Sequence, residues 1–465
     1  MPNFKEKKQI LSQRLHANEC FDIIERELIL DGREAVVFYL NGLVRDELTE
    51  KVLAFLFKNA KDDALISPDM LCKKALPLVE VSIIKDENTA VKNILSGLVT
   101  VLVDWKDREP SFGAISMDMR GYPQRDRGEA EDDKVLRGSK DGFVESVILN
   151  TALLRRRIRD ENFLTRALCV GTSSKTDIVV CWLQNKADIK LVERLIDRIR
   201  SIKTDSLRMN QQSLIEALVS HRWINPFPKV KYTERPDVAS AVCMKGNIVI
   251  LVDNSPSALL IPTSIFDVLD EADDYYFPPV TGTYIRLSRY IISILSVLIT
   301  PLWLLCLQNP ELVPDMFRFV LQTEPVNIPI FFQLLIIEVG IDGLRLASLH
   351  TPSSLTSALG IIGAIAFSQF AIDAGWFTTG ATLYMSFATI ANYSLPNFEL
   401  GYSLKFLRIG LLTLTYLLNI AGFFSGIALI FVLLLTNRTI SGKSFLYPLI
   451  PLNPKALMKS FARFR

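Results

Sequence analysis

The sequence predicts an α/β cytoplasmic region of two subdomains, followed by an all-α polytopic membrane domain of about four to six helices. Charged side chains are unevenly distributed, because residues 1–289 hold 85 of the 102 and residues 290–435 hold only 11. A soluble core helix rarely stays apolar on every face over the length of a membrane span. Four segments of the charge-poor region are long enough, or nearly so, to cross about 30 Å of hydrocarbon: Tyr290–Leu307, Leu355–Ile372, Phe377–Leu395 and Arg408–Leu435.

The first subdomain, residues 1–135, begins with a hairpin pattern. Phe21–Leu30 and Arg33–Leu40 are strand-like, and the Asp31-Gly32 pair between them is typical of a two-residue hairpin turn. Further elements of this subdomain are expected as helices at Asp46–Asn59 and Thr89–Leu95 and as paired strands at Thr100–Trp105 and Phe112–Met119.

The second subdomain, residues 136–283, follows a charged, turn-rich linker or exposed loop at Gly121–Lys134. It repeats the mixture of strand and helix patterns: a helix at Val144–Arg159, strands at Leu164–Val170 and Asp177–Gln184, a helix at Ala187–Ile202 and a strand at Asn247–Asp253. The acidic stretch Asp267–Pro279 then leads into the membrane domain, residues 284–437, and a basic tail, residues 438–465.

Composition narrows the functional classes. The formal net charge of +2 gives no argument for nucleic acid. The basic run Arg155–Arg157 lacks aromatic neighbours, so we expect a solvated helix face or contact with anionic headgroups. The six cysteines are scattered among mostly apolar residues without a C-x-x-C pair, which predicts reduced packing residues in a cytosolic compartment.

Orientation follows from the ends of the apolar region. The hydrophilic start lacks the apolar stretch of a cleavable signal, so the α/β region is expected to stay in the cytoplasm. Arg286 and Arg289 flank the first span, and the tail carries six basic residues and no acid. The positive-inside rule therefore places both ends in the cytoplasm and predicts an even number of crossings. Four is the simplest count, and six results if residues 328–349 and a broken Arg408–Leu435 contribute.

Catalytic signatures are nearly absent. The three histidines lie far apart in the sequence, so neither a metal cluster nor a triad is predicted. Ser441–Ser444 resembles a phosphate-binding loop only faintly, because Asn437 stands where the upstream glycine is required. We therefore expect no enzyme activity, no catalytic residue, no metal and no cofactor.

A polar stripe in the membrane region is the most informative feature. Glu338, Asp342 and Arg345 fall at i, i+4 and i+7, on one face of a helix. Ionisable groups at membrane depth are costly unless they face a bundle interior, a partner or water. Two interpretations remain open: an amphipathic helix lying at the membrane interface, or the lining of a pore or vestibule.

The neighbouring spans add polar and small residues. A helix rich in hydroxyls and amides either packs through interhelical hydrogen bonds or lines a wet path, and the candidates here are Ser368, Gln369, Asp373, Thr382 and Asn392. Glycines permit close approach of helix backbones, and helix packing is favoured over gating for Gly360, Gly363, Gly422 and Gly426.

Taken together in order and spacing, several motifs resemble the GerA family of spore germination receptor A subunits over essentially the whole chain. The matching residues include Arg137, Gly138, Gly142, Phe143, Glu145, Arg156, Arg157, Glu234, Arg235, Pro236, Asp253 and Pro256. Nutrient-receptor A subunits usually have Gly-Pro-Arg-Glu where this chain has Gly138–Asp141, which resembles a sporulation-protein branch of the family. For Arg137–Phe143 an inter-subdomain hinge is favoured over a ligand-contacting loop, and for Asp253–Pro256 a strand-ending turn over a subunit contact.

The resemblance implies an integral protein of the spore inner membrane that forms a homo-oligomer around an ion path. Its expected partners are membrane lipid, other germination membrane proteins and permeant monovalent cations, with no nucleic acid. The leading hypothesis is a subunit of an ion-release complex that amplifies ion release in germination. The alternative is a non-conducting scaffold subunit of a germinant receptor complex.

Overall fold

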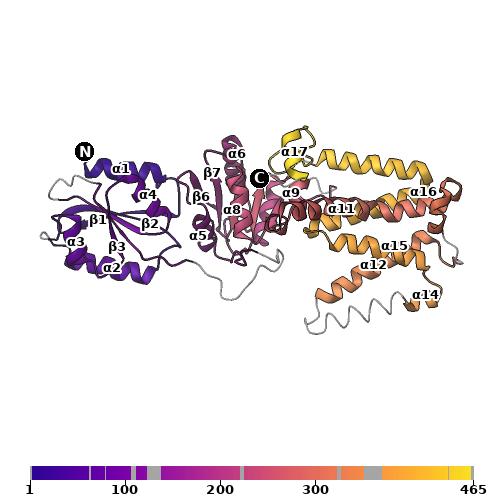
Figure 1. Cartoon of the computed structure of the whole chain (residues 1–465), viewed down its shortest axis with the longest axis horizontal. Helices are drawn as coiled ribbons and strands as arrows, with labels where there is room; N and C mark the ends of the chain where they lie inside the picture. Colours follow the sequence, from indigo (N-terminus) through magenta and orange to yellow (C-terminus); the bar gives the residue numbers. More distant parts are fainter. Residues whose placement is uncertain are drawn as a thin grey trace. The chain divides into compact units, whose positions relative to one another are not determined.

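The chain folds into two compact units, which a computed structural model describes separately (Figure 1). One unit contains residues 1–220 and 230–262, and the other contains residues 221–229 and 263–465. The described residues are 3–61, 64–78, 80–105, 112–122, 138–219, 225–321, 326–349, 369–437 and 439–461.

The first unit consists of two α/β halves, each with a five-stranded antiparallel sheet. The elements of the first half are α1 (Phe4–Leu15), β1 (Ile23–Leu30), β2 (Arg33–Leu40), α2 (Asp46–Asn59), α3 (Pro68–Ala75), β3 (Val81–Ile84), α4 (Glu87–Leu95), β4 (Val99–Val103) and β5 (Ala114–Met117). Its strand order is β1-β2-β4-β5-β3. In Figure 1, α1 and α4 lie on one face of this sheet and α2 and α3 on the other.

The second half repeats this arrangement. Its elements are α5 (Val147–Arg157), β6 (Phe163–Val170), β7 (Thr176–Leu183), α6 (Ile189–Arg200), α7 (Asn210–Leu218), β8 (Lys231–Thr233), α8 (Pro236–Met244), β9 (Ile248–Val252) and β10 (Ala258–Ile261). The order β6-β7-β9-β10-β8 matches that of the first sheet strand for strand, and the helices occupy the same places in the chain order. The unit is therefore a tandem structural repeat.

Local chemistry explains the best-defined elements. The hairpin predicted at Asp31-Gly32 is confirmed, with Leu30 paired to Arg33 and with φ values of 47° and 81° at the two turn residues, as the turn requires. The helix predicted at Asp46–Asn59 has these bounds in the structure. Side chains from β9 and β10 and from α5 and α8 share one apolar core in the second half, which fixes those helices on the sheet.

A buried ion pair joins the two halves of this unit. Arg155 of α5 donates from Nε to Asp22 Oδ2 at 2.7 Å and from Nη2 to Asp22 Oδ1 at 3.1 Å, and Thr165 of β6 donates to the same carboxylate. The Arg155 side chain is only 1% exposed and lies over the Phe163 ring. The expectation that Arg155 belongs to a solvated or headgroup-binding face was wrong, because Asp22, more than a hundred residues away, neutralises its charge.

The second unit is almost entirely helical among the described residues. Its elements are α9 (Ile265–Leu269), α10 (Asp273–Tyr276), α11 (Pro279–Gln308), the short 3₁₀ helices Pro310–Leu312 and Asp315–Val320, α12 (Ile330–Leu349), α14 (Ala371–Asp373), α15 (Thr379–Tyr393), α16 (Phe398–Thr436) and α17 (Pro454–Phe461). Two of the described helices, α11 and α16, are long and apolar enough to cross a membrane. Four residues of the predicted span Leu355–Ile372 are described and the rest lie outside the described residues, so a count of four to six spans stays a prediction.

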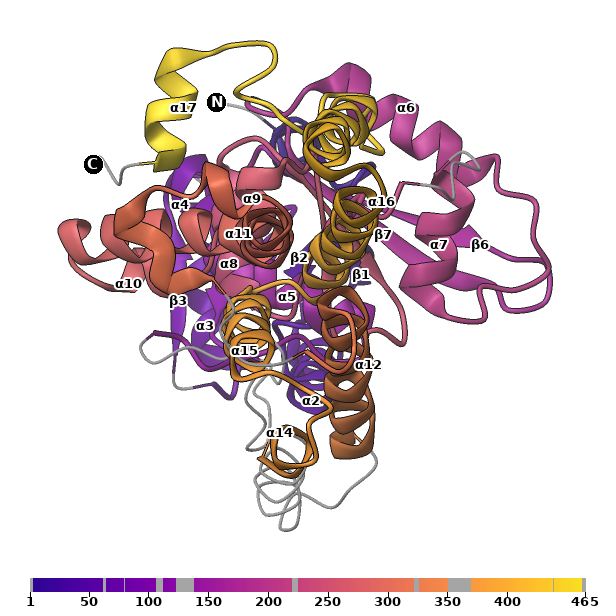
Figure 2. The ribbon, with the colours of Figure 1, turned by 90° about the vertical axis from the view of Figure 1, so that its right-hand side faces the viewer.

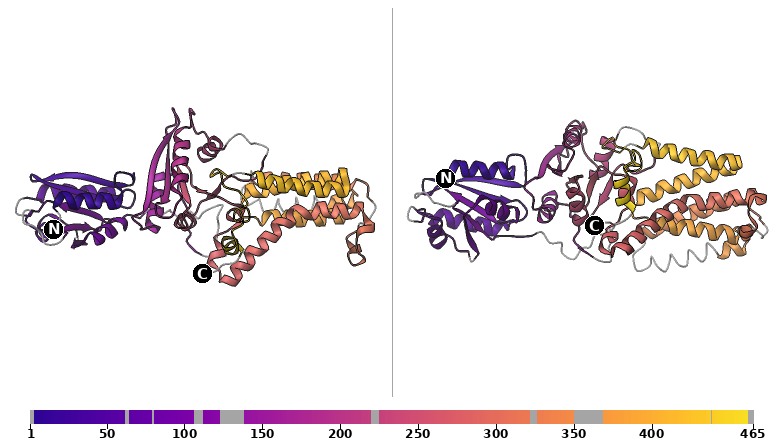
Figure 3. Two further views of the ribbon diagram at one scale, coloured as in Figure 1. Left: turned by 90° about the horizontal axis from the view of Figure 1, so that it is seen from above. Right: turned by 45° about the horizontal axis from the view of Figure 1, so that its top comes forward.

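Helix α16 is a hairpin of two arms that meet at Asn419. This residue has φ 52° and ψ −131°, which no helix contains. A Cβ placed on Gly422 would lie 1.9 Å from the Leu414 carbonyl oxygen, although eight helical residues span about 12 Å. The chain must therefore turn back at Asn419, and Figures 2 and 3 show the two arms side by side. Gly426 likewise faces Leu411 of the first arm.

Candidate functional site

An arginine in the first arm of α16 joins four helices of the second unit. Arg408 donates from Nη2 to both carboxylate oxygens of Glu338 on α12, at 2.6 and 2.8 Å. Its Nη1 donates to the backbone carbonyls of Ser296 on α11, at 2.9 Å, and of Ala388 on α15, at 3.3 Å. The residue is 2% exposed. One guanidinium thus links α11, α12 and α15 to the helix that carries it.

A second cation completes what we call the charge cluster: Glu338, Asp342, Lys405 and Arg408. The Lys405 ammonium lies 3.2 Å from Glu338 Oε1 and also bonds the Asp342 carboxylate. The two cations are three residues apart on α16 and the two anions four residues apart on α12, so both pairs lie on facing sides of their helices. The four formal charges cancel.

Burial differs across the charge cluster. The side chain of Glu338 is 9% exposed, whereas that of Asp342 is 36% exposed. Asp342 therefore forms the open edge of the cluster, and Glu338 with Arg408 forms its closed centre.

The charge cluster lies within the apolar length of α11. Ser296, which accepts from Arg408, is six residues beyond Tyr290 and twelve before Gln308, or about 9 and 18 Å along a helix. Pro301, in the next turn of α11, has no backbone N–H and interrupts the helical hydrogen-bond pattern. The backbone of α11 is therefore looser one turn after Ser296. A charge at that depth is stable only when it is paired.

Arg345 continues the stripe on α12 and lies among three aromatic rings. Its guanidinium lies 4.9–5.4 Å from the ring centroids of Tyr393, Phe398 and Tyr402, a cation–π arrangement. All three stripe residues predicted from the sequence thus contact α16, and Arg345 also contacts α15 through Tyr393. Their role as the lining of a path stays a prediction.

The polar residues predicted on the neighbouring segments are placed differently. Thr382 donates to the Thr378 carbonyl in its own helix, and Asp373 is exposed and accepts from Gln369 at 3.3 Å. Asn392 faces the backbone of Gly401, whose added Cβ would lie 2.9 Å from the Asn392 Oδ1. Ser368, Gly360 and Gly363 lie outside the described residues.

Sequence reasoning missed three residues of this region. Lys405 was not identified, and Arg408 appeared only as the first residue of the predicted span Arg408–Leu435. Yet two cations three residues apart in one helix can face two acids four residues apart in another. Gln333 is 1% exposed, and its Oε1 accepts from the Thr378 N–H at 2.8 Å, which satisfies a free donor at the start of α15. A lone glutamine in an apolar segment is the signal that could have indicated it.

The motif residues of the first unit converge although they are distant in the sequence. Arg157 donates to Asp141 at 2.7 Å and to Ser139 at 2.9 Å, and Arg235 donates to the Ser139 carbonyl at 2.9 Å and to Asp237. Burial raises the pKa of Asp141, but hydrogen bonds from Ser139 and Arg157 outweigh it and lower the pKa to about 2. The carboxylate is therefore charged at neutral pH.

The remaining motif residues position backbone. Phe143 is fully buried and its N–H donates to the Glu234 carbonyl at 2.7 Å, while Asp253 accepts from the Val147 N–H at the start of α5. Gly138 has φ 113°, Gly142 is buried and Pro256 is exposed. The Glu145 carbonyl accepts from the Asn254 N–H, and Pro236 lies in the first turn of α8. The Arg156 guanidinium lies over the Tyr122 ring. Arg137 lies outside the described residues.

An α/β unit joined to a helical unit with two apolar helices of spanning length is the architecture of a membrane-associated protein. The family described as "Bacillus/Clostridium GerA spore germination protein" matches residues 9–465. The chain therefore belongs to the GerA spore germination family, as the motifs predicted.

Individual relatives agree with this assignment. Stage V sporulation protein AF of Bacillus subtilis (strain 168) is 35% identical over 478 residues, which cover 100% of this chain and 95% of that protein. Spore germination protein KA of the same organism is 25% identical over 98% of this chain and 84% of its own length. Among solved structures, the N-terminal domain of the A subunit of the Bacillus megaterium spore germinant receptor GerK3 is 21% identical, covers 56% of this chain and 94% of its own, and gives a TM-score of 0.41.

Proposed function

We propose that this chain is a membrane subunit of an oligomeric complex that releases monovalent cations during spore germination and amplifies that release. The observation that carries the proposal is the charge cluster. An apolar contact of the same volume is often at least as stable as a buried ion pair. Four paired charges at membrane depth are therefore better explained by a function than by stability alone.

Asp342 and Lys405 are the residues proposed to meet the ions. Asp342 is the exposed carboxylate of the charge cluster, and its partner is a single flexible ammonium. A hydrated monovalent cation that replaces the ammonium beside Asp342 leaves the local charge unchanged. Glu338 and Arg408 hold the surrounding helices in register and are not exchanged.

The test is potassium release from germinating spores that carry Asp342→Asn or Lys405→Gln. Each change removes one charge at the open edge, and we expect release to slow by about tenfold, which corresponds to about 1.4 kcal/mol. The matched control is Asp315→Asn, because Asp315 is 87% exposed and pairs only locally with Arg318 among the described contacts. Release at the normal rate from spores that contain normal amounts of both variants would contradict the proposed role of the pair.

A scaffold subunit that conducts no ions is the second candidate. It is favoured by the hydroxyls of α15, since Thr382, Ser386 and Thr389 each donate to the carbonyl four residues earlier in their own helix. Hydroxyls bonded in this way need no water-filled path. This function predicts that the purified oligomer passes no cations across a sealed membrane.

A further inference from the structure

The segment that follows α16 exposes several apolar side chains. Between residues 447 and 461, which include α17, six such side chains are more than a third exposed: Tyr447, Leu449, Ile450, Leu452, Met458 and Phe461. Leu452 and Met458 are 66% and 60% exposed. The same fifteen residues hold two lysines, Lys455 and Lys459, and no acid. An apolar and basic surface of this kind is typical of a segment that lies in a membrane interface.

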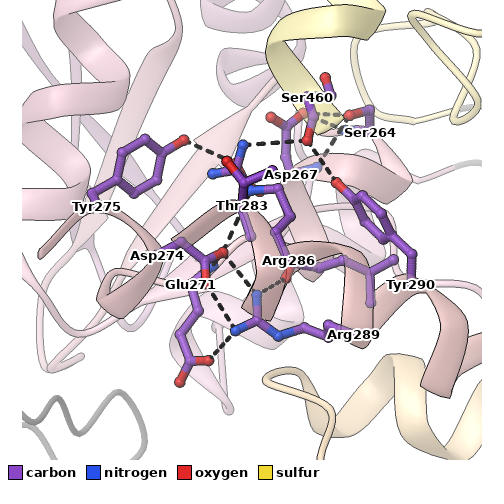
Figure 4. A network of polar contacts seen from close by, with 12 residues as sticks. Ser264, Asp267, Glu271, Asp274, Tyr275, Thr283, Arg286, Arg289, Tyr290 and Ser460 are labelled. Carbon is purple, nitrogen blue, oxygen red and sulfur yellow. Dashed lines mark hydrogen bonds and ion pairs between the residues drawn. The ribbon is translucent and has the colours of Figure 1, made fainter. Parts of the chain in front are cut away.

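Contacts with α11 hold this segment near the start of the apolar stretch of that helix. The Ser460 carbonyl accepts from Arg286 Nη1 at 3.2 Å and from the Tyr290 hydroxyl at 3.1 Å (Figure 4). The Phe461 ring packs edge-on against Tyr290, with 5.3 Å between centroids, and against Phe266, with 5.8 Å. Tyr290 is the first residue of the apolar stretch, so α17 lies level with the membrane boundary.

Three acids of the neighbouring connector are paired with arginines of α11. Arg289 bonds both oxygens of Asp274, at 2.9 and 3.1 Å, and Glu271 at 2.7 Å, and Arg286 Nε lies 3.1 Å from Asp270 (Figure 4). The two arginines of α11 thus offset two of these three negative charges. Lys455 is exposed on α17.

We propose that residues 447–461 lie on the membrane surface at the level of Tyr290, where the apolar stretch of α11 begins, and bind anionic lipid headgroups. The exposed leucine, isoleucine and methionine side chains enter the boundary of the acyl layer, and Lys455 contacts the headgroup phosphates. Juxtamembrane lysines and arginines are attracted in this way by anionic leaflets, and the attraction weakens as salt screens it. Neither the binding nor its test requires ion release.

The experiment compares hydrogen exchange of the full-length protein, one copy per lipid nanodisc, in phosphatidylcholine and in phosphatidylcholine with 30% phosphatidylglycerol. We expect peptides that cover residues 447–461 to exchange several-fold more slowly in the anionic discs, and the difference to shrink at high salt. Lys455→Glu with Lys459→Glu should abolish the difference while the contacts of Ser460 and Phe461 remain.

The matched control is Lys58→Glu with Lys190→Glu, which changes the charge equally at two exposed positions of the first unit. It should leave the lipid dependence as in the wild type. Equal exchange in the two lipids, or an unchanged difference in the tail variant, would overturn the proposal. Protection that appears only with two copies per disc, whatever the lipid, would mean that a second chain covers the segment and would overturn it as well.

Discussion

At the scale of residues, the molecule is organised by arginines whose partners are distant in the sequence. Arg155 pairs with Asp22 inside the first unit, and Arg408 pairs with Glu338 inside the second. Arg155 uses two nitrogens for the two oxygens of Asp22, whereas Arg408 uses Nη2 for both oxygens of Glu338. Such charge-assisted hydrogen bonds offset part of the loss of hydration. Each pair therefore fixes the relative position of segments that apolar packing alone leaves less defined.

The pair of Glu338 and Arg408 allows a quantitative prediction. Glu338→Gln leaves the buried Arg408 without a carboxylate and should lower the free energy of unfolding by about 3–5 kcal/mol. Arg408→Gln should cost less, because Lys405 still lies 3.2 Å from Glu338 Oε1. The double variant removes both charges and should recover most of that loss. Thermal unfolding of the purified protein in detergent measures the cycle. Two single effects that simply add in the double variant would show that the residues do not act as a pair.

The sequence predicted one side of this pair and not the other. Glu338, Asp342 and Arg345 were identified because their spacing places three ionisable groups on one helix face. Arg408 was not, because a cation at the edge of an apolar segment is the usual flank of a span. The burial of Arg155 was also missed, since three consecutive arginines are typical of a solvated helix face.

At the scale of elements, short-range patterns predicted what local chemistry determines. The Asp31-Gly32 turn and the helix Asp46–Asn59 follow from residues within the elements themselves. Helix α1 was missed, because its mean hydropathy is low and its contribution to the core rests on a few residues such as Leu11 and Leu15. The turn at Asn419 lies in an apolar run without proline or glycine at the turn, so a break there remained only one alternative.

The α16 hairpin predicts a strong difference between two glycines of one helix. A Cβ at Gly422 meets the Leu414 backbone at 1.9 Å, whereas a Cβ at Gly410 meets nothing within 4 Å. Gly422→Ala must push the arms apart and should cost about 1–3 kcal/mol. Gly410→Ala should be neutral or stabilising by up to about 1 kcal/mol, because alanine favours helix. Thermal unfolding in detergent compares them, and equal effects at the two positions would contradict the hairpin.

At the scale of the whole molecule, one chain combines a tandem α/β repeat with a helical unit of membrane character. The change from charged to apolar composition indicated an α/β region followed by a helical region. Surfaces that face water need different side chains from surfaces that face lipid. The repeat was not predicted beyond two similar subdomains. The two halves share their strand order and the placement of their helices. Different apolar sequences can form the same arrangement, so the repeat is not visible in the sequence.

Function at this scale depends on whether the charge cluster serves ion movement or only holds helices together. Membership of the GerA family gives the process, spore germination, and leaves the two alternatives open. In a scaffold, paired charges need only be stable. In an ion-release subunit, the exposed carboxylate of Asp342 must also exchange its partner.

The most direct measurement is potassium flux through sealed vesicles that contain the purified protein, wild type against Asp342→Asn, at equal amounts of inserted oligomer. The account predicts flux through the wild type and a reduction of about tenfold in the variant, with Asp315→Asn unchanged. Vesicles that stay impermeable to potassium with the wild type, under the conditions that trigger release in spores, would contradict it and leave the scaffold function.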